Sequence, residues 1–173
     1  MKKFFAIAAV AMMALTANAQ MYVGGSVCFT SIKDSKDADA RNTFVLAPEV
    51  GYNLNENWSV GGSIEYTNWT EGDADGDSFG ITPYVRYTFC KEGMVNLFVD
   101  GGLNYTSFGS KNGSRFGLGV RPGIAVNVND KISLVAKTGF FGYTKYDKDA
   151  GEGSIFGLGV DNSDLSFGVY YNF

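Results

Sequence analysis

Six charged side chains stand at alternate positions within otherwise apolar segments, and their balanced signs point to ion-pair chemistry. They are Glu49, Glu65, Arg86, Asp100, Arg121 and Lys137. Three acidic and three basic groups could pair in an enclosed space, where a charge without a partner would cost several kcal/mol. We therefore interpret the six as a charge network that fills the interior of the protein.

Catalysis and metal binding find little support in this sequence. No histidine is present, which excludes histidine-based acid–base catalysis, serine–histidine triads and histidine metal sites. The run Asp73–Asp77 resembles half of an EF-hand loop, but its glycine is misplaced and no glutamate closes it. We expect a solvated acidic loop there. We also expect no catalytic residue, no metal, no other cofactor and no enzymatic activity.

The first nineteen residues indicate export from the cytoplasm. Two lysines precede an apolar run over residues 4–17, and a small-residue cleavage site follows. The cleavage site is formed by Ala17, Ala19 and Gln20. A transmembrane helix would need about 20 apolar residues, which is longer than this run. We expect a cleaved signal peptide over residues 1–19 and a single domain over residues 20–173.

The mature part of the chain is acidic. Without Lys2 and Lys3, 12 of the 14 basic residues remain against 18 acidic ones, a net charge of about −6. Such a charge argues against nucleic acid as a partner. An exported protein could pair its two cysteines, Cys28 and Cys90, in a disulfide. The topology predicted below places them at opposite ends of the molecule, so we expect free thiols.

Strict alternation of apolar and polar residues recurs along the mature chain and predicts strands. Eight segments show it: Met21–Ser31, Thr43–Leu54, Trp58–Thr70, Ser78–Phe89, Met94–Ser107, Ser114–Val128, Lys131–Tyr146 and a last one ending at Phe173. Short turns alternate with longer polar links, and "SRFGLGV" at Ser114–Val120 returns as "SIFGLGV" at Ser154–Val160. The pattern predicts an all-β protein, an eight-stranded antiparallel up-and-down transmembrane barrel.

Alternation alone leaves open which face points inward. A soluble barrel would bury the apolar face, whereas a membrane barrel would present that face to lipid. Seven glycines lie on the polar face: Gly61, Gly80, Gly102, Gly117, Gly119, Gly123 and Gly139. Inside a narrow barrel they would leave room for large neighbours such as Tyr84. Glycine placement and charge balance together favour a polar interior, with aromatic girdles at both rims.

The chain end carries a further pattern, "LSFGVYYNF". Its apolar residues alternate up to the last position: Leu165, Phe167, Val169, Tyr171 and Phe173. This ending resembles the C-terminal strand signature of bacterial outer-membrane proteins, which the barrel-assembly machinery reads. With the signal peptide, the hairpin repeat and strands such as "PEVGYNL", the whole mature chain resembles the small outer-membrane β-barrel family of the OmpA/OmpX type.

The resemblance implies a place in the outer membrane of a Gram-negative cell envelope. It implies partners in outer-membrane lipid, lipopolysaccharide, periplasmic chaperones and the barrel-assembly machinery, and we expect a monomer. The OmpA branch often adds a periplasmic peptidoglycan-binding domain. This chain stops at the barrel, so that function is not carried over.

The expected function is structural or interactive: envelope integrity, adhesion or surface recognition through acidic extracellular loops, with the lumen plugged by the charge network. The main alternative is a narrow porin-like channel. A lipid-modifying enzyme is a third class, but barrels of that kind, by family resemblance, rely on histidine. A soluble ligand-carrying barrel is a fourth. Because eight strands leave an interior about filled by side chains, we expect Arg86→Ala to keep ion conductance near baseline.

Two irregularities lie within the predicted strands. The only three prolines, Pro48, Pro83 and Pro122, fall inside strands of the same direction. Since proline lacks the N–H that a sheet ladder needs, we expect a bulge at each. In the last strand the apolar parity changes between Leu158 and Leu165. Either residues 160–164 form a slip, or "SIFGLGV" is an extension of the rim.

Overall fold

The structure is a computed structural model that describes residues 20–33, 40–72, 74–109, 113–147, 149–159 and 165–173. Its described part contains ten strands. They are β1 (Met21–Ile32), β2 (Arg41–Asn53), β3 (Trp58–Glu71), β4 (Ala74–Glu92), β5 (Val95–Phe108), β6 (Ser114–Asn127), β7 (Ile132–Lys137), β8 (Phe140–Tyr146), β9 (Gly153–Gly159) and β10 (Ser166–Asn172). No helix in the described ranges has the length and apolarity to cross a membrane.

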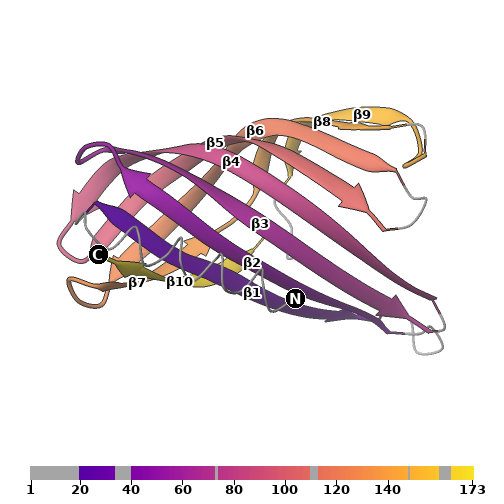
Figure 1. Ribbon diagram of the computed structural model, residues 1–173, viewed down its shortest axis with the longest axis horizontal. Helices are drawn as coiled ribbons and strands as arrows, with labels where there is room; N and C mark the ends of the chain where they lie inside the picture. The colour runs from indigo at the N-terminus through magenta and orange to yellow at the C-terminus, as the bar shows by residue number, and fades with distance from the viewer. Residues whose placement is uncertain (1–19, 34–39, 73, 110–112, 148, 160–164) are drawn as a thin grey trace, which may run out of the picture.

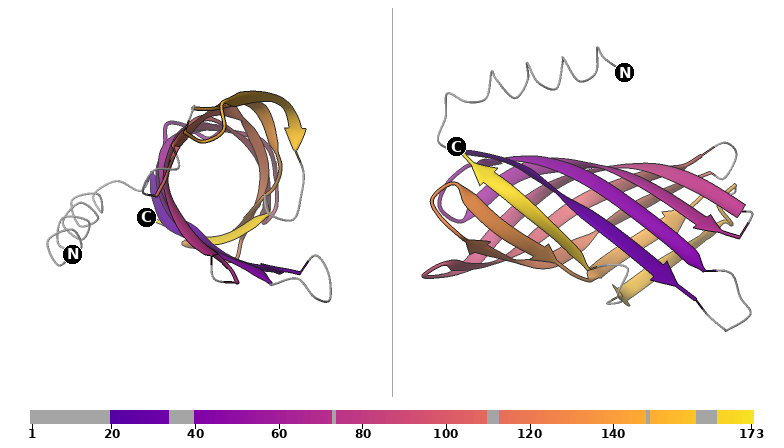
Figure 2. Two further views of the ribbon diagram at one scale, coloured as in Figure 1. Left: turned by 90° about the vertical axis from the view of Figure 1, so that its right-hand side faces the viewer. Right: turned by 90° about the horizontal axis from the view of Figure 1, so that it is seen from below.

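The strands close into an antiparallel barrel with eight strand positions around the ring, which we call staves. β7 and β8 share the seventh stave, and β9 and β10 lie along the eighth. β1 to β6 each pair with the next strand, and β6 pairs with both β7 and β8. β10 closes the ring because it pairs with β7 on one side and with β1 on the other. The end-on view shows the resulting ring (Figure 2), and the side view shows the tilt of the strands (Figure 1). The predicted all-β, eight-stranded antiparallel barrel is confirmed.

The seventh stave is interrupted, although the sequence predicts one strand over Lys131–Tyr146. β6 pairs with β7 in one register and with β8 in a register shifted by one residue. Gly139, between the two strands, has a φ of +68°, in the region that favours glycine. The N–H of Thr138 donates to the carbonyl of Pro122 at 3.1 Å. The extra residue is a bulge that lies opposite Pro122.

The other two prolines lie in regular ladders, so the expectation of a bulge at each is wrong. β2 and β3 keep one register on both sides of Pro48, and β4 and β5 keep one register on both sides of Pro83. In both cases pairing with the following strand lapses at the proline and at the residue before it and then resumes in the same register. A local lapse is enough to accommodate one missing N–H. The register shift between β4 and β5 falls instead between Thr88 and Cys90.

The hairpin of β3 and β4 is longer than the sequence predicts. We expected the acidic run Asp73–Asp77 to be a loop, but β4 begins at Ala74 and pairs with β3 from that residue onward. Gly72 makes the turn with a φ of +58°. The indole of Trp69 lies over Gly76, where a Cβ would come within 2.7 Å of the ring. This packing explains how an acidic segment is held in the sheet.

At the end of the barrel with the longer links, which we call the loop end, β9 leaves the ring. β9 pairs only with β8 among the described residues, and Phe156 and Leu158 are 72% and 71% exposed. Figure 2 shows this strand beside the ring. The interpretation of "SIFGLGV" as a rim extension therefore holds for the described part, and the expected slip over residues 160–164 lies outside it. The outer part of β1, which contains the free thiol Cys28, pairs only with β2 among the described residues.

The two faces of the barrel wall differ sharply in composition. Large apolar side chains point outward, among them Ile64, Leu118 and Val169. At the opposite end, which has the short turns and which we call the turn end, Trp58 and Tyr87 pack with ring centroids 4.7 Å apart on the exterior. Glu49, Arg86 and Asp100 are instead less than one-tenth exposed, inside the ring. The apolar face is the one a bilayer would cover, and the polar face forms the core.

Candidate functional site

The centre of the lumen holds an arginine–aspartate pair. Arg86 on β4 and Asp100 on β5 are direct partners in the sheet register, so both side chains point inward at the same height. The Nε of Arg86 donates to Asp100 Oδ1 at 2.6 Å, and its Nη2 donates to Oδ2 at 2.9 Å. This two-bond geometry is the strongest that a guanidinium and a carboxylate can form.

Glu49 on β2 and Lys137 on β7 complete a ring of four charges with that pair. The Nζ of Lys137 lies 2.8 Å from Glu49 Oε2 and 3.2 Å from Asp100 Oδ2. The Nη2 of Arg86 lies 3.2 Å from Glu49 Oε1. Two carboxylates and two cations therefore balance one another in the interior. We call Glu49, Arg86, Asp100 and Lys137 the central network.

Four aromatic rings enclose the central network. The Cζ of Arg86 lies 3.9 Å from the ring centroid of Phe98 and between 5.2 and 5.5 Å from those of Tyr22, Tyr84 and Tyr170. The hydroxyls of Tyr84 and Tyr170 donate to Glu49 Oε1 at 2.5 and 2.6 Å. Among the described residues, no buried polar side-chain atom lacks a hydrogen-bond partner. Cation–π contacts and hydrogen bonds together satisfy the buried charges.

Glycines on neighbouring strands make the room for these rings. A Cβ on Gly61 would come within 2.4 Å of the Tyr84 hydroxyl, and a Cβ on Gly123 would come within 2.4 Å of Phe98. In the same way, a Cβ on Gly51 would clash with the ring of Tyr22, and a Cβ on Gly24 would clash with the ring of Tyr170. Sequence reasoning named Tyr84 as a large neighbour of glycine but did not identify Tyr22 and Tyr170 as part of the site. A signal in the sequence could have found them, because each tyrosine occupies an inward position beside an inward glycine on the adjacent strand.

The structure separates the other two predicted network residues, Glu65 and Arg121, from the central four. Neither makes an ion pair with any residue in the described ranges. Arg121 is a register partner of Asp100 on the side of β6. Both oxygens of Asp100, however, are already bound by Arg86, and one of them also by Lys137. Both Glu65 and Arg121 line a cavity closer to the loop end.

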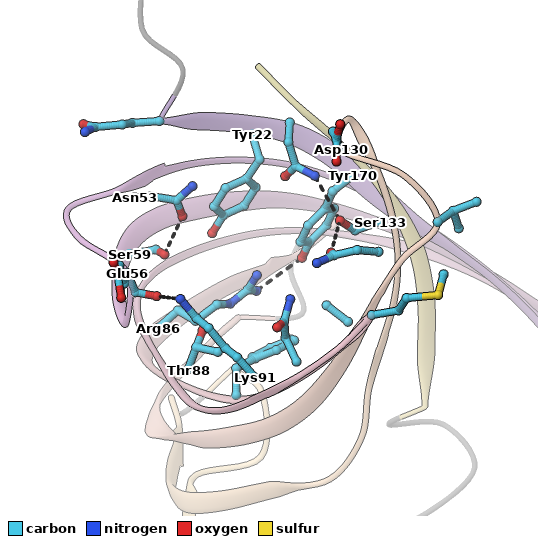
Figure 3. Close-up of a pocket in the computed structure, with 18 of the residues that line it drawn as sticks. Tyr22, Asn53, Glu56, Ser59, Arg86, Thr88, Lys91, Asp130, Ser133 and Tyr170 are labelled. Carbon is cyan, nitrogen blue, oxygen red and sulfur yellow. Dashed lines mark hydrogen bonds between the residues drawn. The ribbon is translucent and has the colours of Figure 1, made fainter.

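Two cavities lie on either side of the central network. The one at the turn end measures about 1010 Å³, and Arg86, Tyr22 and Tyr170 are among its lining residues (Figure 3). The one toward the loop end measures about 460 Å³, and Asp100 and Lys137 are among its lining residues. The network thus lies between two spaces that open toward opposite ends of the barrel.

The rim of the turn-end cavity contains a duplicated turn that the sequence analysis missed. Residues 53–59 read NLNENWS and residues 127–133 read NVNDKIS. In the first copy Asn55 Oδ1 accepts hydrogen bonds from two backbone N–H groups at 2.9 Å, and in the second Asn129 Oδ1 does so at 2.8 Å. The serine of each copy donates to its first asparagine, at 2.7 and 2.8 Å. Only three of the seven residues are identical, which concealed the repeat.

The other predicted site residues have a simpler placement. No group of three or more potential ligands among the described residues could hold a metal ion. Ala17 and Ala19 of the expected cleavage site lie outside the described ranges, and Gln20 begins them. In the terminal segment, Leu165, Phe167, Val169 and Tyr171 are exposed on the exterior of the barrel wall. The N–H of Phe173 donates to the carbonyl of Met21 at 2.9 Å and so helps to join the end of β10 to the start of β1.

Several solved structures share this barrel architecture. Neisserial surface protein A matches with a TM-score of 0.56 and 21% identity, over 88% of this chain and 97% of that one. Outer membrane protein OprG from Pseudomonas aeruginosa matches with a TM-score of 0.51 and 12% identity, over 89% and 96% of the two chains. Outer membrane protein Ail from Yersinia pestis matches with a TM-score of 0.50 and 18% identity, over 90% and 100%. Identities this low establish a common fold.

A search of curated proteins finds no significant match. The family model described as "Outer membrane protein beta-barrel domain", in contrast, matches residues 4–173, almost the whole chain. The outward apolar face, the closed ring of eight staves and this match agree with one another, and the chain belongs to the family of outer-membrane proteins with this β-barrel domain.

Proposed function

We propose that this barrel is a non-conducting, non-enzymatic protein of the outer membrane, with a structural or interaction role at the loop end. The observation that carries the proposal is the central network, which is buried, electrically balanced and placed between the two cavities. In this proposal the network and its four aromatic rings plug the lumen. Envelope integrity, adhesion or surface recognition would then depend on the wall and the loops.

The energetics of the network support a plug. Removing one member of a buried ion pair leaves a charge without a partner, at a cost of about 3–5 kcal/mol. Opening a water path through the central network would break the Arg86–Asp100 hydrogen bonds of 2.6 and 2.9 Å. It would also move the guanidinium away from the aromatic rings around it. The interior of an eight-stranded barrel is also about filled by side chains. These contacts support a closed lumen.

One loop is held in a fixed position at the loop end, as a recognition surface requires. Asp147 Oδ2 accepts hydrogen bonds from the N–H and the hydroxyl of Ser114, both at 2.8 Å. Asp147 Oδ1 accepts one from the N–H of Ala150 at 2.9 Å. These bonds tie the segment after β8 to the start of β6. An acidic loop with a defined shape suits contact with a partner outside the cell.

The proposal includes the route of assembly and the surroundings of the barrel. Periplasmic chaperones would deliver the chain to the barrel-assembly machinery, which would read the terminal segment that ends at Phe173. The mature barrel would be a monomer in contact with outer-membrane lipid and lipopolysaccharide. The support for this route is the outward alternation of β10 and its position as the strand that closes the ring.

A narrow channel is the second candidate function. It is favoured by the two cavities, of about 1010 and 460 Å³, because only the central layer lies between them. A rearrangement of that one layer would join the two spaces. The channel and the plug differ in one measurable property, which is ion conductance.

Planar-bilayer recordings of the refolded barrel test the proposal. We expect conductance near baseline for the wild type and also for Arg86→Ala, because Tyr22, Tyr84, Phe98 and Tyr170 still fill the layer. Arg41→Ala is the matched control, since Arg41 is exposed at the loop end. Stepwise conductance of the wild type would contradict the plug and favour the channel.

A further inference from the structure

We propose that the loop-end cavity binds a small organic anion that carries an apolar group. The cavity measures about 460 Å³ and lies between the central network and the loop end. This volume falls within the range of sites that hold small molecules. The proposal does not depend on whether the lumen conducts, because a ligand could enter from the loop end in either case.

The lining of this cavity carries a surplus of positive charge. Its charged residues are Glu65, Asp100, Arg115, Arg121 and Lys137. Asp100 and Lys137 belong to the central network, whose four charges cancel. Two arginines then face one glutamate. This local excess contrasts with the mature chain, which has a net charge of about −6, and an electropositive pocket attracts anions.

The two arginines have the donors that an anion needs. Arg121 is half-buried and makes no ion pair within the described ranges. Arg115, also half-buried, donates from Nη2 to the neutral hydroxyl of Thr106 at 3.3 Å. A guanidinium presents several N–H groups in a planar fork that matches a carboxylate or phosphate. A partly desolvated arginine without a counter-charge gains charge-assisted hydrogen bonds when an anion binds.

The wall formed by β8 and β9 supplies the apolar half of the site. Phe140 and Ile155 line the cavity there. The ring of Phe140 is packed over Gly119, where a Cβ would come within 2.5 Å of it. A ligand with a carboxylate and an aromatic or short aliphatic group would place its charge near β6 and its apolar part against this wall. Purely inorganic anions would leave the apolar wall in contact with water.

The test uses benzoate and its uncharged isostere benzamide as probes. The mature barrel is refolded into lipid nanodiscs, and binding is measured by calorimetry after subtraction of the signal from empty nanodiscs. We expect benzoate to bind at least about tenfold more tightly than benzamide, because a hydrogen bond to a charged group contributes about 1.5–3 kcal/mol. Arg121→Gln and Arg115→Gln should each weaken benzoate binding about tenfold and leave benzamide unchanged. Glu65→Gln should strengthen benzoate binding, since Glu65 is the one negative charge outside the central network among the described lining residues.

Arg41→Gln is the control, because this arginine is exposed and its guanidinium lies over the ring of Trp69, 5.1 Å from the centroid, instead of lining the cavity. Benzoate affinity should not change in this variant. Heat-modifiable gel mobility verifies that each variant is folded, and if Arg121→Gln fails to fold, Arg115→Gln carries the test. The proposal would be overturned by equal affinity for benzoate and benzamide. It would also be overturned if benzoate affinity stayed unchanged in both Arg121→Gln and Arg115→Gln.

Discussion

Arg86 and Asp100 face each other across β4 and β5, and the guanidinium binds both oxygens of the carboxylate, at 2.6 and 2.9 Å. The sheet register brings them to the same height. Glu49 and Lys137, on strands β2 and β7, close the ring of charges from the other side. The barrel interior is therefore organised around one pair, to which the other members are added.

Replacing Arg86 by alanine should destabilise the barrel strongly. The change leaves Asp100 with Lys137 alone and gives the central network a net negative charge, and we expect the free energy of unfolding to fall by about 3–5 kcal/mol. Urea unfolding in lipid vesicles, followed by heat-modifiable gel mobility, measures this. Arg41→Ala removes the same side chain from an exposed position, where its guanidinium lies over the ring of Trp69, and should change the unfolding free energy by no more than about 1 kcal/mol. Similar values for the two variants would show that the network contributes little to stability.

The adjacent glycines Gly61 and Gly62 should differ in their tolerance of a methyl group. A Cβ on Gly61 would meet the hydroxyl of Tyr84 at 2.4 Å, whereas the nearest atom to a Cβ on Gly62 lies at 3.8 Å. We expect Gly61→Ala to lower the free energy of unfolding by about 1–3 kcal/mol through overpacking. Gly62→Ala, the matched control on the outward face, should leave it nearly unchanged, as measured in the same unfolding experiment. Equal effects would contradict the packing of Tyr84 over Gly61.

The loop held by Asp147 should loosen in acid. The hydroxyl of Ser114, together with backbone N–H groups of Ser114, Asp149 and Ala150, lowers the pKa of Asp147 below its ordinary value of 3.8. A lowered pKa in the folded state means that the contribution is present above the ordinary value and is lost as the pH falls through the folded value, below 3.8. Hydrogen exchange of residues 149–153, measured relative to the intrinsic exchange rate at each pH, should therefore accelerate in that window.

Asp147→Asn should produce the same acceleration at neutral pH, because the amide is a weaker acceptor than the carboxylate. Asp149→Asn is the control, since only the backbone N–H of Asp149 takes part in the contact. Protection that is identical in the wild type and in Asp147→Asn at neutral pH would show that this carboxylate does not hold the loop.

The strands and the division of their residues into two faces could be predicted because both depend on local alternation, and charge balance and glycine placement predicted which face points inward. The side-chain period of a strand is two, so residues such as Arg86 and Ile124 are assigned to opposite faces from their neighbours alone. The breaks in the seventh and last staves were not predictable in the same way. The bulge opposite Pro122 depends on a strand that contacts it only in the folded barrel.

The site was predictable in its composition but not in its pairings. All six predicted charges lie on the inward face, yet only four of them meet, because Asp100 binds Arg86 and Lys137 and leaves Arg121 without an ion pair in the described structure. Glu49 and Lys137 are separated by 88 residues in the chain. Their contact requires a closed ring with a particular register, which no local pattern specifies.

The sequence by itself determined that each strand has an apolar face and a face of glycine, aromatic rings and balanced charges, since a strand alternates whatever its partners are. The balance of charges and the glycines on the polar face then predicted that this face fills the middle of the barrel. The tertiary structure alone decided which charges neutralise one another and which arginines remain to line the loop-end cavity. Those choices follow from distances of a few ångströms between side chains on different staves, and such distances exist only once β10 has joined β1 to β7.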